Sequence, residues 1–231
     1  MNHHDTNPEY FRNKSKRDYI RKTQEIIQKE GRESVSIRRI AREMHCSSAN
    51  LYCHFQNRQE LIYYAELIRH ASFVHRLNEA EKNWKNIWDF YVGIWDCYCR
   101  EAFRNPDAYD LLFLQAQTDT FKNAVSEYYS LFPEAFLESS EVFGGLLTQK
   151  DFMARDFEIC KKCVSEGAIS LEKAIQLNRM VCQMYKGYFK SVQENKLSEE
   201  MIDAEVTRFV EDVDWMVMHL ADDLKGYKGY R

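Results

Sequence analysis

Residues 36–61 read SIRRIAREMHCSSANLYCHFQNRQEL, and their apolar residues recur with the period of an α-helix. A first apolar stripe runs from Ile37 to Met44, and a second one contains Leu51 and Phe55. Residues three and four positions apart share one face of a helix. The stretch therefore predicts two short helices that are joined by a tight turn.

The flanking residues supply the start and stop signals of these helices. A helix over residues 16–30 precedes the pair, and Gly31 is placed where a left-handed cap ends such a helix. Ser36 and Ser47 are suited to cap the next two helices, because a serine hydroxyl accepts a bond from a free backbone N–H group. Asn57 is suited to cap a further helix. The unit predicted here is a helix-turn-helix, whose second helix, about 48–54, suits a DNA major groove.

This pattern resembles the TetR family of bacterial transcription regulators over residues 12–62. The matching residues are Gly31, Ser36, Arg38, Ile40, Ala41, Ser47, Leu51, Tyr52, His54, Phe55, Arg58, Glu60 and Leu61. Two positions differ, because His45 replaces the usual turn glycine and Cys46 replaces the usual valine. Histidine adopts a positive φ more readily than most residues, so we expect the turn to persist.

The helix-turn-helix geometry divides the predicted DNA contacts into two groups. We expect base edges to be read by Ser48, Ala49, Asn50 and Cys53, with Ser47 at the start of the helix. Asn50 is the best reader, because its amide pairs bidentately with adenine. By the resemblance and by their place at helix ends, we expect phosphate contacts from Ser36, Arg38, Arg39, Tyr52, His54 and Arg58. Two alternatives stay open: Tyr52 packs against the preceding helix, and Arg39 is an ordinary solvated charge.

Positive charge is concentrated around this motif. The chain of 231 residues has a formal net charge of −4, yet residues 1–70 hold 13 Lys and Arg against 9 Asp and Glu. A basic segment on an acidic chain is typical of a small phosphate-contacting domain. The basic run over residues 12–22 is either an arm near the phosphates or a solvated helix face.

The remaining sequence predicts an all-α fold. It shows helical periodicity, no convincing strand alternation and only three prolines in the whole chain. We expect a DNA-binding domain over residues 1–62 and a helical regulatory and dimerisation domain over 63–231. The expected helices cover about residues 58–77, 83–104, 119–131, 151–165, 170–195 and 198–222, with a short helix at Pro106 and a less regular stretch over 133–150.

The last two helices, which Ser170 and Ser198 are suited to cap, are the expected dimer interface. By the resemblance, they form a four-helix bundle with a second copy of the chain. The residues predicted to lie there are Met184, Tyr188, Phe209, Val213, Val217 and Leu220. Trp215 and Met218 lie off the main apolar stripe of their helix, which indicates burial against a second partner. The alternative is that both helices form only the core of one chain.

Aromatic residues in the middle of the chain suggest a pocket for an unknown small-molecule effector, as the resemblance also implies. The predicted lining consists of Trp88, Tyr91, Trp95, Tyr98, Phe113 and Tyr128. Apolar walls with a few polar tips are typical of ligand pockets. An aromatic stripe at helical spacing is more often part of a filled core, and this alternative stays open.

The seven cysteines predict no metal site and no cofactor. Cys160 and Cys163 form a single Cys-x-x-Cys pair, which is weak evidence for zinc without a second pair. Structural roles are expected for the thiols. Redox sensing remains an alternative, and Cys53 is its most consequential thiol.

Taken together, these features predict a cytoplasmic, homodimeric repressor that binds a palindromic operator in double-stranded DNA and is released by a small-molecule effector. Two alternatives are a DNA-binding organiser that acts through a protein partner and a cysteine-based redox regulator. No sequence pattern of a phosphate loop, a Glu-x-x-His pair or a nucleophile elbow occurs, so we do not expect an enzyme. No apolar run approaches the about 18 residues of a membrane span.

Overall fold

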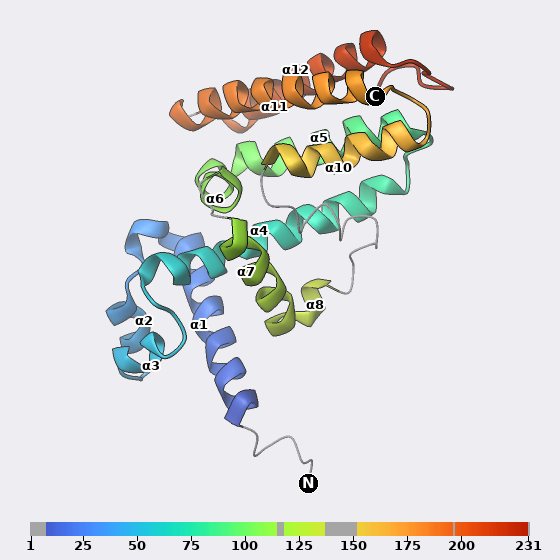
Figure 1. The fold of residues 1–231 in the computed structure, drawn as a ribbon. Coiled ribbons are helices and arrows are strands. Elements are labelled where there is room, and N and C mark those ends of the chain that lie inside the picture. The colour runs from blue at the N-terminus through green and yellow to red at the C-terminus, as the bar shows by residue number, and fades with distance from the viewer. Residues whose placement is uncertain (1–7, 115–117, 137–151, 196, 231) are drawn as a thin grey trace. The chain divides into compact units, whose positions relative to one another are not determined.

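The computed structural model describes residues 8–114, 118–136, 152–195 and 197–230. Within these ranges every regular element is a helix and no strand occurs, which confirms the predicted all-α fold (Figure 1). The described residues belong to two compact units. We call Met1–His70 with Asn123–Leu137 the head unit, and Ala71–Lys122 with Glu138–Arg231 the body unit.

The head unit contains the helix-turn-helix. Its elements are α1 (Pro8–Glu30), η1 (Arg32–Ser34), α2 (Ile37–Glu43), α3 (Ser48–Tyr52), the first part of α4 (Arg58–Glu81), most of α7 (Thr118–Leu131) and α8 (Pro133–Phe136). Its core is closed by side chains with at most 1% exposure, namely Ile20, Ile40, Leu51, Phe55 and Leu61. The two predicted apolar stripes therefore meet in one core.

Three of the four helix caps that the sequence predicts in this unit are formed. Ser36 Oγ accepts a hydrogen bond from Arg39 N at 3.2 Å. Asn57 Oδ1 accepts one from Glu60 N at 2.9 Å, and Gly31 has a φ of 80°. Ser47 stands before α3 with extended backbone, but its hydroxyl makes no capping bond.

A part-buried polar cluster joins helix α7 to α1 and α4. Lys16 Nζ lies 2.6 Å from Glu127 Oε1 and 4.1 Å from the centre of the Tyr64 ring. The Tyr64 hydroxyl donates to the same carboxylate. Burial is the main reason that the pKa of Tyr64 is raised, followed by its bond to Glu127.

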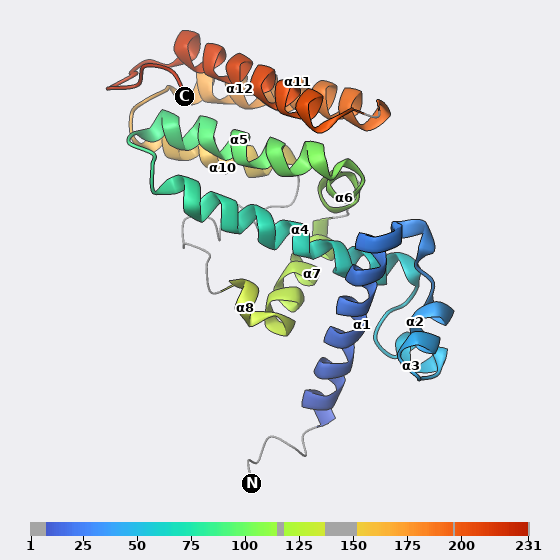
Figure 2. The ribbon, with the colours of Figure 1, turned by 180° about the vertical axis from the view of Figure 1, so that it is seen from behind.

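The body unit consists of stacked layers of helices (Figures 1 and 2). Its elements are the end of α4, α5 (Ile87–Arg104), α6 (Pro106–Tyr109), the π-helical turn η2 (Asp110–Leu114), α10 (Phe152–Ser165), α11 (Leu171–Glu194) and α12 (Glu199–Leu220). Helix α5 packs against α10, α11 and α12, and α11 packs against α10 and α12. Ser170 and Ser198 cap α11 and α12 as predicted, accepting bonds from Lys173 N and Met201 N.

The predicted start of the helix after α4 is wrong by about four residues. Helix α5 begins at Ile87, because the Asn86 side chain accepts from Trp88 N and Asp89 N, each at 2.9 Å. Trp84 therefore precedes the helix. Part of the stretch 133–150 is helical as α8, and its residues from 137 onwards lie outside the described residues.

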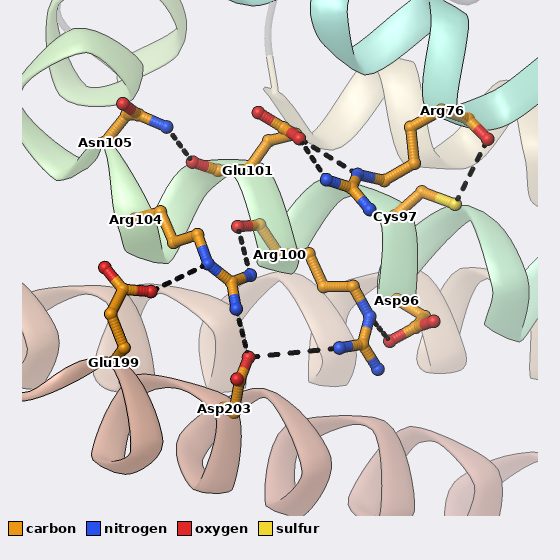
Figure 3. A network of polar contacts seen from close by, with 9 residues as sticks. All are labelled: Arg76, Asp96, Cys97, Arg100, Glu101, Arg104, Asn105, Glu199 and Asp203. Carbon is orange, nitrogen blue, oxygen red and sulfur yellow. Dashed lines mark hydrogen bonds and ion pairs between the residues drawn. The ribbon is translucent and has the colours of Figure 1, made fainter.

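A charged network joins α5 to α12 (Figure 3). Arg104 Nε lies 3.1 Å from Glu199 Oε2, and Arg104 also pairs with Asp203. Arg100 Nε pairs with Asp96 Oδ1 at 2.9 Å. These contacts lie beside the packed apolar face between the two helices.

Candidate nucleic-acid interface

The turn before α3 fixes the orientation of the predicted recognition helix. His45 has a φ of 54°, the left-handed conformation that glycine adopts most easily. Cys46 N then donates to Ala41 O at 2.9 Å, and the Tyr19 hydroxyl donates to Cys46 Sγ at 3.6 Å. Burial, followed by this contact with Cys46, raises the pKa of Tyr19 to about 12. The backbone thus turns tightly although no glycine is present.

Helix α3 buries one side and exposes the other. Leu51 is fully buried, whereas Ala49, Asn50, Tyr52 and Cys53 are exposed. The residues predicted to read bases are therefore at the surface of the head unit, with Ser48 half-buried beside them. Helix α3 ends at Tyr52, two residues before its predicted end.

Ser47, the residue before α3, orients the side chain of Asn50. Ser47 Oγ donates to Asn50 Oδ1 at 2.8 Å, while Asn50 N donates to Ser47 O at 3.1 Å. The hydroxyl that does not cap the helix therefore holds the Asn50 amide instead. A pre-oriented amide loses less conformational freedom when it binds a base.

Two arginines on α2 are free to meet phosphate. Arg38 and Arg42 are exposed, and among the described residues neither has an ion-pair partner. They are four positions apart, so they lie on one face of the helix. Sequence reasoning missed Arg42, although its spacing from Arg38 was the available signal.

Arg39 is engaged within the head unit. Its guanidinium binds both carboxylate oxygens of Glu30, at 2.5 and 2.8 Å, and Glu43 at 2.7 Å. These bonds lower the pKa of Glu30 and of Glu43. The structure thus places Arg39 in an ion-pair network that ties α1 to α2, and in this arrangement its charge is already compensated.

Arg58 holds the loop between α1 and α2. Its Nε donates to Val35 O and a terminal nitrogen donates to Arg32 O, each at 2.7 Å. Its side chain is only 32% exposed, and the exposed Glu33 lies 3.6 Å away. This structural role was not visible in the sequence, where Arg58 was predicted from the resemblance to contact phosphate.

Tyr52 and His54 differ in their surroundings. The Tyr52 side chain is 58% exposed, so it does not pack into the core beside α1. His54 is half-buried, and its ring centre lies 5.5 Å from that of Tyr19 and 6.3 Å from that of Phe55. Tyr52 is thus available for a phosphate contact, while His54 also supports the core.

The predicted pocket residues are all buried. Trp88, Tyr91, Trp95, Tyr98 and Phe113 lie in the body unit, whereas Tyr128 lies in the head unit. In the body unit the rings pack on one another, with Trp95 and Tyr98 both 5.3–5.6 Å from Tyr185 between ring centres. Tyr128 stacks on Phe132 at 4.6 Å.

The residues predicted to lie in the dimer interface differ in how deeply they are buried within one chain. Phe209, Val213 and Val217 have no exposed surface, so within one chain they face the core between α12 and the other helices. Met184, Tyr188 and Leu220 are half-buried. Strongly exposed apolar side chains lie elsewhere on α11 and α12, at Leu171, Ile175, Met201, Trp215 and Met218. The apolar stripe that the sequence made most visible is the intrachain one.

A family model for bacterial regulatory proteins of the tetR family matches residues 20–65. The match runs from the buried half of α1, through the turn at His45, into the start of α4. Residues 20–65 thus carry a DNA-binding domain of the TetR type, which confirms the predicted resemblance over this segment. The chain is a DNA-binding transcriptional regulator with a helix-turn-helix.

Solved structures similar to this chain have low sequence identity to it. One is a protein assigned to the TetR family of transcription regulators from Shewanella sp. PV-4, with 14% identity and a TM-score of 0.50. The match covers 90% of this chain and 99% of that protein. Another is the TetR-family regulator PfmR from Thermus thermophilus, with 13% identity, a TM-score of 0.46, and 87% and 97% coverage. No curated protein matches the sequence.

The family match over residues 20–65 and the geometry together indicate what the head unit offers to DNA. Its α3 carries an exposed amide, and its α2 carries two uncompensated arginines within the described residues. None of the described helices has the length and apolar composition that a bilayer crossing needs.

Proposed function

We propose that the chain is a homodimeric repressor that binds a palindromic operator and is released by a small-molecule effector. The observation that carries the DNA-reading part is the Asn50 amide, exposed on α3 and held by Ser47 Oγ at 2.8 Å. Asn50 reads adenine in the major groove, and Ser48, Ala49 and Cys53 contact neighbouring bases. Arg38, Arg42, Ser36 and Tyr52 hold phosphates on either side.

The dimer part of the proposal follows from what a single head unit can bind. One five-residue recognition helix contacts few base pairs, so two copies on a two-fold axis are needed to read a long palindrome. The exposed apolar residues of α11 and α12 supply a surface that a second copy would cover. This surface includes Ile175, Met201, Trp215 and Met218.

Selection of bound fragments from random DNA tests the DNA-reading part. We expect a two-fold symmetric site with an adenine that depends on Asn50. Asn50→Ala should cost about 1–3 kcal/mol at that base pair and accept other bases there. Gln59→Ala, which removes an exposed amide on α4, serves as the control and should keep the preference. An unchanged base preference in Asn50→Ala would exclude Asn50 as a reader.

A second candidate is a DNA-binding organiser that has no effector and acts through a protein partner. The observation that favours it is the close packing of aromatic rings inside the body unit, where Trp95, Tyr98 and Tyr185 contact one another. A small molecule that lowers operator affinity in a binding assay would support release by an effector. Capture of a defined partner together with DNA, without any such molecule, would support the organiser.

A redox regulator is the remaining candidate, and it depends on Cys53. Cys53 is exposed on the surface that we assign to DNA. Burial raises the pKa of Cys97 and of Cys163 to about 12, which disfavours the reactive thiolate at those positions. If this candidate holds, mild oxidation should abolish DNA binding reversibly, and Cys53→Ser should resist it.

A further inference from the structure

An open groove of about 820 Å³ lies in the body unit, where the turn between α4 and α5 meets the chain that follows α12. The groove is lined by Trp84 and Lys85 from the turn and by Lys228 and Tyr230 from the chain after α12, among other residues. This chain segment is the red end of the ribbon in Figures 1 and 2. The volume is in the range of small-molecule sites.

The segment after α12 is fixed to the body unit by several hydrogen bonds. Trp88 Nε1 donates to Asp223 O at 2.8 Å. Tyr230 N donates to Asp214 Oδ1 at 3.2 Å, and the Tyr227 hydroxyl donates to the same oxygen. The Tyr230 hydroxyl lies 3.4 Å from Asp96 Oδ2. One wall of the groove is thus formed before any ligand binds.

Another part of the lining is a fixed aromatic ring. The Trp84 indole lies directly on the backbone of Gly93 in α5, where an added Cβ atom would be 2.4 Å from the ring. Its ring also meets Phe90 edge-to-face, with 5.6 Å between the ring centres. A half-buried indole held in this way presents a rigid surface to a planar group.

The groove carries two uncompensated positive charges. Lys85 and Lys228 are exposed, and in the part of the chain that the structure describes neither has an ion-pair partner. The carboxylate in the lining, Asp89, accepts from Lys85 N at 2.9 Å and from Asn86 Nδ2 at 3.0 Å. The lining therefore holds two ammonium groups against one carboxylate that already has two donors.

A rigid aromatic surface and two ammonium groups in one lining are complementary to one chemical class. We propose that this groove binds a small organic anion with a planar ring, which stacks against Trp84 while its anionic group meets Lys85 and Lys228. Two positive charges attract the anionic group, and burial of the ring against the indole adds apolar contact; both contribute to binding. Neither residue set was singled out by the sequence. The site lies outside the aromatic core predicted to hold an effector.

Isothermal titration of the full chain without DNA tests this proposal. The probe is 2-naphthoate, compared with its neutral analogue 2-naphthamide and with acetate, which has no ring. We expect saturable binding of one 2-naphthoate per chain, at least about tenfold tighter than either comparison compound. The measurement needs no operator, so its result is independent of the proposed repressor function.

Three variants assign the binding to the groove. The double variant Lys85→Ala with Lys228→Ala should lower the affinity for 2-naphthoate at least about tenfold and leave the affinity for 2-naphthamide unchanged. Lys225→Ala removes an exposed lysine of the same segment that does not line the groove, and it should bind like the unmodified chain. Trp84→Leu should lower the affinity for both naphthyl compounds. Circular dichroism should confirm that this variant is folded.

Several results would overturn the proposal. One is equal affinity for 2-naphthoate and 2-naphthamide, which would leave no role for the lysines. Another is undiminished binding in the double lysine variant, or an equal loss in Lys225→Ala. Absence of any saturable binding at millimolar probe would also overturn it.

Discussion

At the scale of single residues, His45 is the position where the helix-turn-helix departs most from ideal local geometry. A side chain with a Cβ atom in the left-handed region costs about 1–2 kcal/mol relative to the right-handed one. The turn tolerates this because Cys46 N bonds to Ala41 O at 2.9 Å immediately afterwards. The family's usual glycine would relieve the strain.

His45→Gly should therefore stabilise the folded chain by about 0.5–1 kcal/mol, since part of the relief is offset by the greater freedom of glycine in the unfolded chain. Urea unfolding at neutral pH measures this difference. His45→Ala is the matched control, because alanine keeps the Cβ atom and should give no gain. A glycine variant that is less stable than the original would show that the histidine ring makes a compensating contact.

Arg58 and Arg38 should behave differently when each is replaced by alanine. Arg58 donates to the Val35 and Arg32 carbonyls, each at 2.7 Å, so its loss removes two part-buried bonds, although Arg32 O keeps its bond from Val35 N at 3.1 Å. We expect Arg58→Ala to lower the free energy of unfolding by about 1–3 kcal/mol. Arg38 is exposed and makes no such bonds, so Arg38→Ala should change stability by less than about 0.5 kcal/mol.

DNA binding provides the second measurement on the same pair. Arg38→Ala should weaken binding to all sequences alike and reduce the salt dependence by about one phosphate contact. A loss that is confined to one operator sequence would contradict the phosphate role. For Arg58→Ala, a folded variant with an unchanged salt slope would show that Arg58 acts through the loop alone.

At the scale of helices, the sequence predicted those features that depend on local chemistry. Ser36, Ser170 and Ser198 cap helices as expected, because one hydroxyl beside a helical pattern is a local signal. The start of α5 was predicted too early because Trp84 fits the helical period of the apolar residues. The helix begins only after Asn86, whose side chain caps it. Periodicity alone does not separate a turn residue from a first helical residue.

The role of a helix face was less predictable than the helix itself. Phe209 and Val213 form the strongest apolar stripe of α12, and that stripe fills the core of the same chain. The exposed side chains, Trp215 and Met218, were recognised as lying off the stripe. Deciding which face meets which neighbour needs the three-dimensional packing. The same holds for Arg39 and Arg58, whose partners are distant or backbone atoms.

Asp156 on α10 gives the body unit a pH-dependent stability. It is buried, and it accepts hydrogen bonds from Asn178 Nδ2 at 2.8 Å, Trp95 Nε1 at 2.9 Å and the Tyr91 hydroxyl at 3.3 Å, with Cys160 Sγ at 3.7 Å. Burial raises its pKa to about 6, compared with about 3.9 in an unfolded chain.

Between these two pH values the folded chain therefore holds more protons than the unfolded chain. The contribution of Asp156 is fully present below about pH 4 and is lost as the pH rises through about 6, on the order of 3 kcal/mol. Unfolding at pH 4, 5, 6 and 7 should show this downward trend as the difference between the original chain and Asp156→Asn. Asp107→Asn, which changes an exposed carboxylate, should retain it. Parallel curves for the original chain and Asp156→Asn would refute the assignment.

At the scale of the whole chain, charge is divided in the way that DNA binding requires. Residues 1–70 hold 13 basic and 9 acidic side chains within a chain of net charge −4. The basic segment over residues 1–70 attracts the duplex, whereas the acidic remainder of the chain repels it. This asymmetry favours one binding orientation and makes association weaken steeply with salt.

The proposed dimer is the property of the whole molecule that one substitution tests most directly. Trp215 is 59% exposed on α12, and its ring stacks on His219 with 4.0 Å between the ring centres. Because large aromatic side chains dominate interfaces, Trp215→Glu should place a charge in the contact and cost at least about 2 kcal/mol of dimer stability. Sedimentation equilibrium should then show a shift towards the monomer at micromolar concentration. Tyr52→Glu, at an equally exposed aromatic of α3, should stay dimeric while losing DNA binding. A Trp215→Glu chain that remains fully dimeric would place the interface on another surface, whereas a chain that is monomeric without any substitution would remove the dimer from the proposal.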